Sequence, residues 1–200
     1  MIRRPLRSLR SATGGVAAVE FGLLAVPFLV LILGTLDLGY QAYLRALTTG
    51  ALERAARKAT VGNQTKAAVV TLIKTEVGAI LPNNAKNDDN AITVVPLSYH
   101  DFATVGGGER ITGDTAPVGQ YNSTDCYEDR NNNGRYDATN GGGDDLGSAD
   151  DILYYNVTVA VPRFFPFLTW AGFDPKTTVT ARTLIRNQPY GEQSVRIRCA

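Results

Sequence analysis

The feature of this sequence that most restricts its fold is an apolar run of 21 residues near the N-terminus. Residues 16–36 contain a single charged residue, Glu20. A helix of this length spans roughly 30 Å at about 1.5 Å per residue, which matches the hydrocarbon core of a bilayer. The run therefore predicts a transmembrane helix. The alternative is a buried helix of a soluble protein, but such helices rarely need so long a continuous apolar run.

The residues in front of this run are basic. Without residues 1–15 the chain holds 16 basic and 19 acidic residues, so the positive charge is local and does not indicate a nucleic-acid surface. Basic residues before a membrane span predict a cytoplasmic N-terminus and an exported C-terminal part. The basic residues of this leader are Arg3, Arg4, Arg7 and Arg10.

Glu20 is the unusual residue of the apolar run. A carboxylate within hydrocarbon costs about 2–3 kcal/mol even on lenient scales, so such a residue is usually paired and functional. A protease cut after Gly15 would give Val16 a free amine with a pKa of about 8, and therefore a positive charge. The amine and Glu20 would lie on one helix face. In an assembly, the amine could instead pair with Glu20 of the adjacent subunit and set the axial register.

The helix is expected to continue beyond the membrane. After Asp37, apolar residues recur in steps of three and four, which predicts one helix from Val16 to about Thr60. Pro27 should kink it, because proline removes a backbone hydrogen bond. A second helix is predicted over 65–81, ended by Pro82. The predicted stripe of the first helix consists of Leu36, Tyr40, Leu44, Leu47, Ala51 and Ala55.

The rest of the chain predicts a small antiparallel sheet and a long loop. Strand patterns occur at 91–99, 152–161, 177–185 and 193–199. A loop rich in Gly, Asn and Asp separates the first two strands, and a loop of that length is usually functional or ordered by a metal. The predicted fold class is therefore α+β. Its parts are a basic leader (1–15), a transmembrane and amphipathic helix (16–62) and an exported α+β head (63–200).

An apolar cluster, "FFPFLTWAGF", occupies 164–173. It predicts a short helix that either caps the sheet or faces a partner. We favour the cap, because small isolated apolar patches usually belong to a core.

The N-terminal pattern "RSATGG / VAAVEFGLL" resembles a class III signal for a prepilin peptidase. A basic leader precedes a small residue at the cut, Gly15, and an apolar run with glutamate at mature position five, followed by Phe21. The resemblance is closer still to the TadE-like minor pilins of tight-adherence (Tad, Flp-type) pilus systems. Three further stretches agree: "LDLGYQAYLRALTTGALERAARKA", "CYEDRNNNGRYD" followed by "GSADDILYYNVTV", and "RTLIRNQPYG", in which Gln188 stands where glutamate is usual. Residues 101–124 match nothing in this family.

The resemblance implies a structural, non-enzymatic role. A protein of this kind is expected to be a single-pass inner-membrane protein with a periplasmic head, processed by the peptidase and used in small numbers to initiate or tip an adherence fibre. Its implied partners are other Tad pilins and the assembly platform.

Other interpretations of the N-terminus stay open. An ordinary secretory signal needs a small-x-small cleavage site after its apolar core, and only "DLGYQAYLRA" follows Leu36. Arg3-Arg4-Pro5-Leu6 resembles a twin-arginine signal, but the apolar run starts late and carries an acid. An uncleaved anchor that carries a periplasmic or surface binding module is the main alternative.

The two cysteines, Cys126 and Cys199, do not form a CxxC pair. In an exported chain they most simply make one disulfide, which would tie the C-terminal end to the head and contribute about 2–5 kcal/mol. Two unpaired thiols are the alternative.

The acidic loop contains a calcium-like pattern. Asp129, Asn131, Asn133 and Asp137 occupy positions 1, 3, 5 and 9 of an EF-hand-type loop, Gly134 stands at position 6, and Arg135 would lend its carbonyl oxygen. Position 12 departs from the pattern, because Asn140 replaces the bidentate glutamate. A replacement carboxylate would have to come from Asp144, Asp145, Asp150 or Asp151. The alternative is a solvated, turn-rich loop.

The sequence carries no recognisable catalytic motif. It has no GxSxG, HExxH or P-loop pattern, and one histidine with two distant cysteines makes zinc improbable. We expect His100 beside Asp101 to be a loop contact rather than a catalytic relay. An anchored enzyme with an unrecognised site is the third hypothesis.

Overall fold

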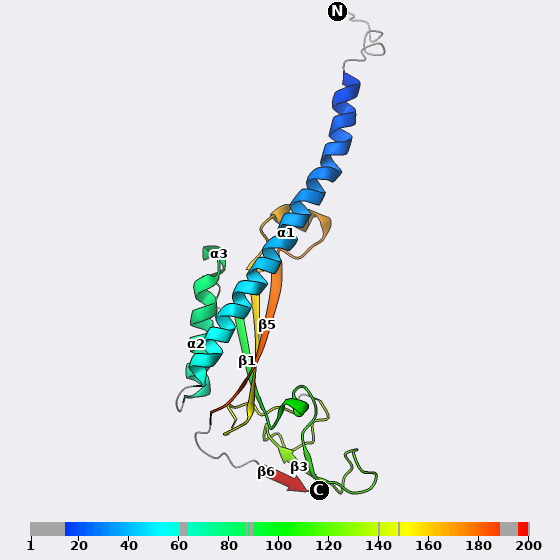
Figure 1. Cartoon of the computed structure of the whole chain (residues 1–200). Helices are drawn as coiled ribbons and strands as arrows, with labels where there is room; N and C mark the ends of the chain where they lie inside the picture. Colours follow the sequence, from blue (N-terminus) through cyan, green and yellow to red (C-terminus); the bar gives the residue numbers. More distant parts are fainter. Residues whose placement is uncertain are drawn as a thin grey trace, which may run out of the picture.

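A computed structural model of the chain describes residues 15–60, 64–86, 88, 90–139, 141–147, 149–188 and 196–199. Residues 1–14 of the predicted basic leader, Asn140, and residues 189–191 of the C-terminal signature lie outside these residues. One long helix projects from a head built of a second helix and two small antiparallel sheets (Figure 1). The expected α+β class is confirmed.

Helix α1 (Val16–Ala59) is continuous over 44 residues, close to the predicted bounds. It is long and apolar enough to cross a membrane, and none of its most apolar 18-residue window is buried. Pro27 lies inside the helix, and Figure 1 shows that the N-terminal part of α1 leaves the line of its C-terminal part.

The C-terminal half of α1 forms part of the core of the head. Leu44, Ala51 and Ala55 of the predicted stripe are buried, whereas Leu36, at the end of the apolar run, is 54% exposed. The small residues allow α1 to lie close to α2 (Lys66–Ile80) and to strand β5. The other buried residues of this half are Asp37, Thr48, Leu52, Ala56 and Ala59.

Helix α2 forms where the sequence predicts it. The side chain of Thr65 caps its first turn by accepting a hydrogen bond from the backbone N of Ala68 at 3.3 Å. Val69, Ile73 and Val77 recur every four residues and are fully buried. The short helix α3 (Asn83–Lys86) follows Pro82.

The main sheet has the order β1-β4-β5 and is antiparallel throughout. Its strands are β1 (Ile92–Tyr99), β4 (Ile152–Pro162) and β5 (Lys176–Arg186). The two helices cover one face of it, onto which β4 turns alternate buried residues. These are Tyr155, Val157, Val159 and Val161.

The predicted long loop is not structureless. It contains the turn η3 (Phe102–Thr104) and strands β2 (Ile111–Gly113) and β3 (Cys126–Asp129). With β6 (Arg196–Cys199) these strands make a second sheet of order β2-β3-β6, so the expectation of one sheet was wrong. β6 lies within the predicted strand 193–199, whereas β2 and β3 are too short for an alternation of apolar residues to be recognised from sequence.

The apolar cluster forms the turn η4 (Pro166–Ala171), which joins β4 to β5. The short helix was expected, but the preferred role as a cap was wrong. Trp170 is 92% exposed, and Phe164 and Phe173 are more than half exposed. The segment lies beside α1 rather than beneath the sheet (Figure 1).

Candidate functional site

The four residues of the predicted processing site lie at the start of α1. Gly15 precedes the helix and supplies no side-chain cap, and Val16 is its first residue. Val16 is 51% and Phe21 74% exposed, and Glu20 is also exposed. These side chains are exposed, so the described part of the head does not cover the peptide bond between Gly15 and Val16.

Glu20 lies one helical turn after Val16. Among the residues that the structure describes, no ion pair or hydrogen bond reaches its carboxylate. The next basic residue along the helix is Arg45, which lies roughly 37 Å away at ordinary helical rise. A positive partner for Glu20 therefore has to come from outside the described chain or from another molecule.

A second acidic residue of α1, Asp37, has a partner within the chain. The carboxylate is 2% exposed, and its Oδ2 lies 2.8 Å from Nη1 of Arg163, which follows β4. The side-chain amide of Gln41 donates to the same oxygen at 2.9 Å. This ion pair joins the helix to the head at the level where the apolar run ends. The pair could not be predicted from sequence, because the two residues are 126 positions apart and no sequence pattern links them.

Arg163 also shapes the segment that it begins. Its Nε donates to the carbonyl oxygen of Asp174 at 2.7 Å, and its backbone N donates to that of Pro175 at 3.0 Å. Its guanidinium lies 5.5 Å from the ring centroid of Phe173. Arg163 therefore joins the two ends of the β4–β5 connection and binds the connection to α1.

The calcium-like loop is organised around Asp129, which is 1% exposed. Its Oδ2 accepts hydrogen bonds from the backbone N of Gly134 and from Arg198 of β6. Gly134 has a φ of +77°, which glycine adopts without strain. The side-chain amides of Asn131 and Asn133 both donate to Oδ2 of Asp137, at 2.6 and 2.8 Å.

The backbone of this loop has the tight turn that the pattern predicts. The side-chain oxygen of Asn131 accepts a hydrogen bond from Asn133, and that of Asn133 accepts one from Arg135 at 2.7 Å. Within the described chain, no three His, Cys, Asp or Glu side chains are gathered as a preformed metal site. The loop is thus held by its own hydrogen bonds and by Arg198.

The carboxylates proposed for position 12 are engaged elsewhere. Asp144 pairs with Lys66, Asp145 accepts from Ser98, and Asp150 and Asp151 pair with Arg186 and Arg130. A different buried acid approaches the loop instead. Glu109 is 4% exposed and accepts backbone hydrogen bonds from Arg130 at 3.0 Å and Asp137 at 3.1 Å.

Glu109 lies in an electronegative environment. Burial raises the pKa of its carboxyl, and the nearby carboxylates of Asp137 and Asp129 raise it further. Glu109 could not be predicted from sequence as part of this loop, because it precedes the calcium-like pattern by twenty residues.

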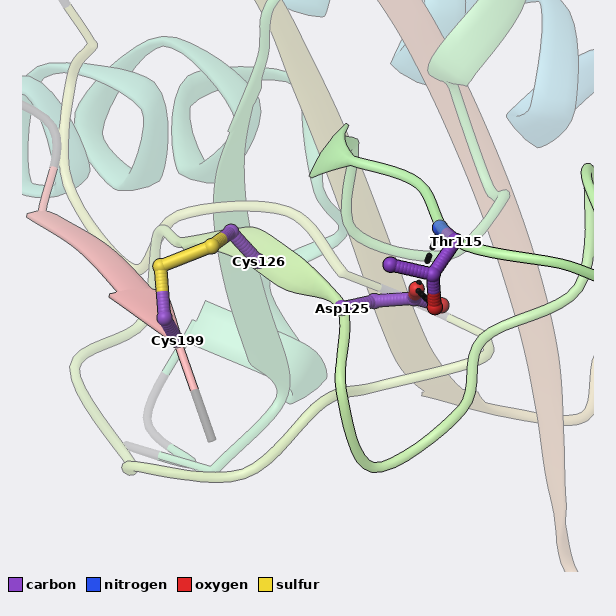
Figure 2. Close-up of a disulfide and its surroundings, with 4 residues drawn as sticks. All are labelled: Thr115, Asp125, Cys126 and Cys199. Carbon is purple, nitrogen blue, oxygen red and sulfur yellow. Dashed lines mark hydrogen bonds between the residues drawn. A yellow bond between two sulfur atoms is a disulfide. The ribbon is translucent and has the colours of Figure 1, made fainter.

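Cys126 and Cys199 are joined by a disulfide between paired positions of β3 and β6 (Figure 2). Beside it, Asp125 is fully buried and accepts hydrogen bonds at 2.7 Å from the backbone and the hydroxyl of Thr115 and from the backbone of Asn122. Burial opposes its ionisation, but these hydrogen bonds prevail and hold the pKa of Asp125 below its ordinary value. Asp125 thereby orders the segment before β3, which lies within the residues 101–124 that match nothing in the family.

His100 is a loop contact. Its Nδ1 lies 4.0 Å from Asp151, whereas its neighbour Asp101 caps η3 by accepting from the backbone of Thr104 at 2.9 Å. The two adjacent side chains therefore serve different local structures.

The ion pair between Asp37 and Arg163 yields a test by double mutation. Removing one partner with Arg163→Met should lower the free energy of unfolding by about 3–5 kcal/mol, because a buried carboxylate is left unpaired. Adding Asp37→Leu to this variant should restore most of the loss, since the unpaired charge is then gone. Thermal and denaturant unfolding of the full chain in detergent micelles measure both.

The control is Arg57→Met, which breaks the exposed pair with Glu53 on the same helix, 3.8 Å apart. Exposed pairs contribute little, so this variant should unfold like the parent. If Arg163→Met also unfolds like the parent, the ion pair does not join helix and head.

Comparison with known proteins gives one match. Residues 15–57 match the model of the family described as TadE-like protein. No curated protein and no solved structure matches the chain. The matched segment begins at Gly15, immediately before α1, and ends two residues before the helix does. The resemblance to TadE-like proteins of Tad pilus systems is thereby confirmed over α1, and it is this segment of the chain that is similar to them.

Proposed function

We propose that this protein is a minor pilin or pseudopilin-like subunit that takes part in assembly of a Tad (Flp-type) pilus for surface adherence. Helix α1 anchors the newly made chain in the inner membrane, with the head on the periplasmic side. A prepilin peptidase then cuts after Gly15, and the head enters the fibre or its assembly complex with α1 directed into the fibre core. The role is structural and involves no catalysis.

The observation that carries this proposal is the place of the TadE-like match. It starts at the residue after which the proposed cut falls and covers the helix that would enter the fibre. The N-terminal half of that helix is apolar yet is not covered by the head. An apolar helix of this length needs either lipid or neighbouring helices, and a pilin subunit meets these two environments in turn.

Glu20 supports the same proposal. A carboxylate without a partner within the described chain is unfavourable in hydrocarbon, and the amine created at Val16 would neutralise it. Across two subunits this pairing would align neighbouring helices at one axial position. The partners implied are the peptidase, other Tad pilins and the assembly platform.

N-terminal processing is the first test. The protein is isolated from membranes of cells with and without the prepilin peptidase, and its N-terminus is sequenced and its intact mass measured. We expect a chain that starts at Val16 only when the peptidase is present. A chain that keeps its leader arginines in both cells contradicts the pilin proposal and favours the permanent anchor with a binding module.

The role of Glu20 has its own test. Glu20→Gln keeps the size of the side chain but removes its charge, so the protein should stay in the membrane and be lost from sheared fibres and from crosslinked complexes with other pilins. Glu53→Gln on the same helix, which is exposed at the head, is the matched control and should assemble normally. Normal assembly of Glu20→Gln would count against the pairing with the amine.

We also propose that the head binds calcium, as a second property that either an assembled pilin or an unprocessed binding module could use. The supporting observation is a loose acidic cluster of Asp129, Asp137 and Glu109, in which burial and the two neighbouring carboxylates raise the pKa of Glu109, although the three side chains are not gathered as a preformed metal site. Oδ1 of Asp129 is buried and has no hydrogen-bond partner among the described residues. A divalent cation would offset the repulsion in this cluster, and its oxygen-rich side chains suit calcium.

For calcium, the expected result is a higher melting temperature of the full chain at millimolar calcium, because an ion that binds only the folded state stabilises it. Asp137→Asn should diminish the shift, and Glu76→Gln, on α2 where the carboxylate pairs with Lys58 of α1, should leave it intact. An equal melting temperature with calcium and with a chelator would contradict the proposal that the head binds calcium.

A further inference from the structure

The connection between β4 and β5 is an exposed aromatic surface at the point where α1 leaves the head. We call residues 163–175 the aromatic collar. Trp170 is 92%, Phe164 59% and Phe173 54% exposed. Exposed aromatic side chains gathered in this way usually mark a surface that meets a partner.

The height of the collar along α1 is fixed by two contacts. Arg163 pairs with Asp37 at 2.8 Å, and the ring of Phe164 packs on Tyr40 with centroids 5.1 Å apart. Asp37 follows Val16 by 21 residues, which is roughly 32 Å of helix. That length equals the hydrocarbon thickness of a bilayer, so the collar lies where a membrane crossed by the N-terminal half of α1 would end.

The composition of the collar suits the interface between lipid and water. Its sequence holds four phenylalanines and the single tryptophan of the chain, and no charged residue stands between Phe164 and Phe173. Tryptophan is enriched at the headgroup level of membranes, because its ring is apolar while its N–H needs a hydrogen-bonding partner.

The two charges at the ends of the collar are already engaged. The guanidinium of Arg163 pairs with Asp37 and donates to the carbonyl of Asp174. The carboxylate of Asp174 accepts a hydrogen bond from the backbone of Lys176 at 2.9 Å. The guanidinium of Arg163 is therefore already paired within the protein and needs no lipid headgroup as its partner.

The exposed face of α1 continues this surface. Leu36 is 54% and Leu38 67% exposed beside the collar, and the apolar run before them is uncovered. Exposed apolar side chains therefore occur both on the collar and on α1 at the same height, and the helix is the part long enough to cross a bilayer.

We propose that the aromatic collar seats in the headgroup region of the phospholipid bilayer that α1 crosses. It holds the head against the membrane at a fixed height before assembly. This inference rests on the membrane anchoring in the proposed function, but it requires neither cleavage nor a pilus.

The single tryptophan provides the test. The full chain is reconstituted in phosphatidylethanolamine–phosphatidylglycerol vesicles, and its insertion is established by flotation. Fluorescence of Trp170 is then quenched either by lipids brominated near the headgroup, by lipids brominated near the bilayer centre, or by aqueous acrylamide. We expect blue-shifted emission, strongest quenching by the shallow bromines, and acrylamide quenching several-fold weaker than in the control variant.

The control variant moves the reporter to the other end of the main sheet. Trp170→Phe combined with Phe102→Trp places the only tryptophan on η3, at an exposed position. Tyr99 pairs with Ile152, so η3 follows the end of the sheet that lies ten residues of β4, or roughly 33 Å, from the collar end. This tryptophan should be quenched by acrylamide and not by brominated lipid.

Three results would overturn the inference, and they differ in what else they affect. If the chain floats with the vesicles but Trp170 behaves like the control tryptophan, the collar is wrong and the anchor stands. If Trp170 is protected only at high ratios of protein to lipid, the collar is a contact between subunits. If the chain does not float, both the collar and the anchoring in the proposed function fail.

Discussion

The head and the apolar segment that is long enough to cross a membrane share one helix, and the rest of the structure depends on how the head holds that helix. The grip is made by small side chains. Ala51, Ala55 and Ala56 are buried and let the backbone of α1 approach β5 and α2 closely. Any movement of the N-terminal half of α1 is therefore transmitted to the core of the head. A linker would have allowed the head to turn freely, whereas a continuous helix fixes its direction relative to the membrane or the fibre.

The ion pair between Asp37 and Arg163 extends this grip to the edge of the apolar run. The buried alanines do not reach this part of the helix, where Leu36 and Leu38 are exposed. At this height the helix is held by a charged contact and by the packing of Tyr40 on Phe164. A buried charge pair needs correct geometry to be favourable, so it specifies one position of the collar against α1 more sharply than apolar packing would.

The parts of the fold that sequence predicts are those whose signal is local. The helices α1 and α2 and the strands β1, β4 and β5 each carry several turns or alternations of apolar residues, so their bounds agree within a few residues. Strands β2 and β3 of the second sheet escaped prediction because they are short and depend on a distant cysteine and on buried acids such as Asp125, whereas β6 lies within the predicted strand 193–199. Close packing also left no signal, as at Gly141, where a Cβ atom would lie 2.3 Å from the backbone N of Glu109.

Two carboxylates on α1 show why part of the site could be predicted and part could not. Glu20 was found from sequence because a charge inside an apolar run is anomalous whatever the fold. Asp37 stands at the end of the run, where a charge is ordinary, and its importance follows only from Arg163, which the fold brings to it. The structure pairs Oδ2 of Asp37 with Arg163 of the same chain and offers Glu20 no partner among the described residues. A charge inside hydrocarbon is unfavourable, so this difference supports the proposal that Glu20 receives a positive charge from processing or assembly, whereas Asp37 is already paired within a single subunit.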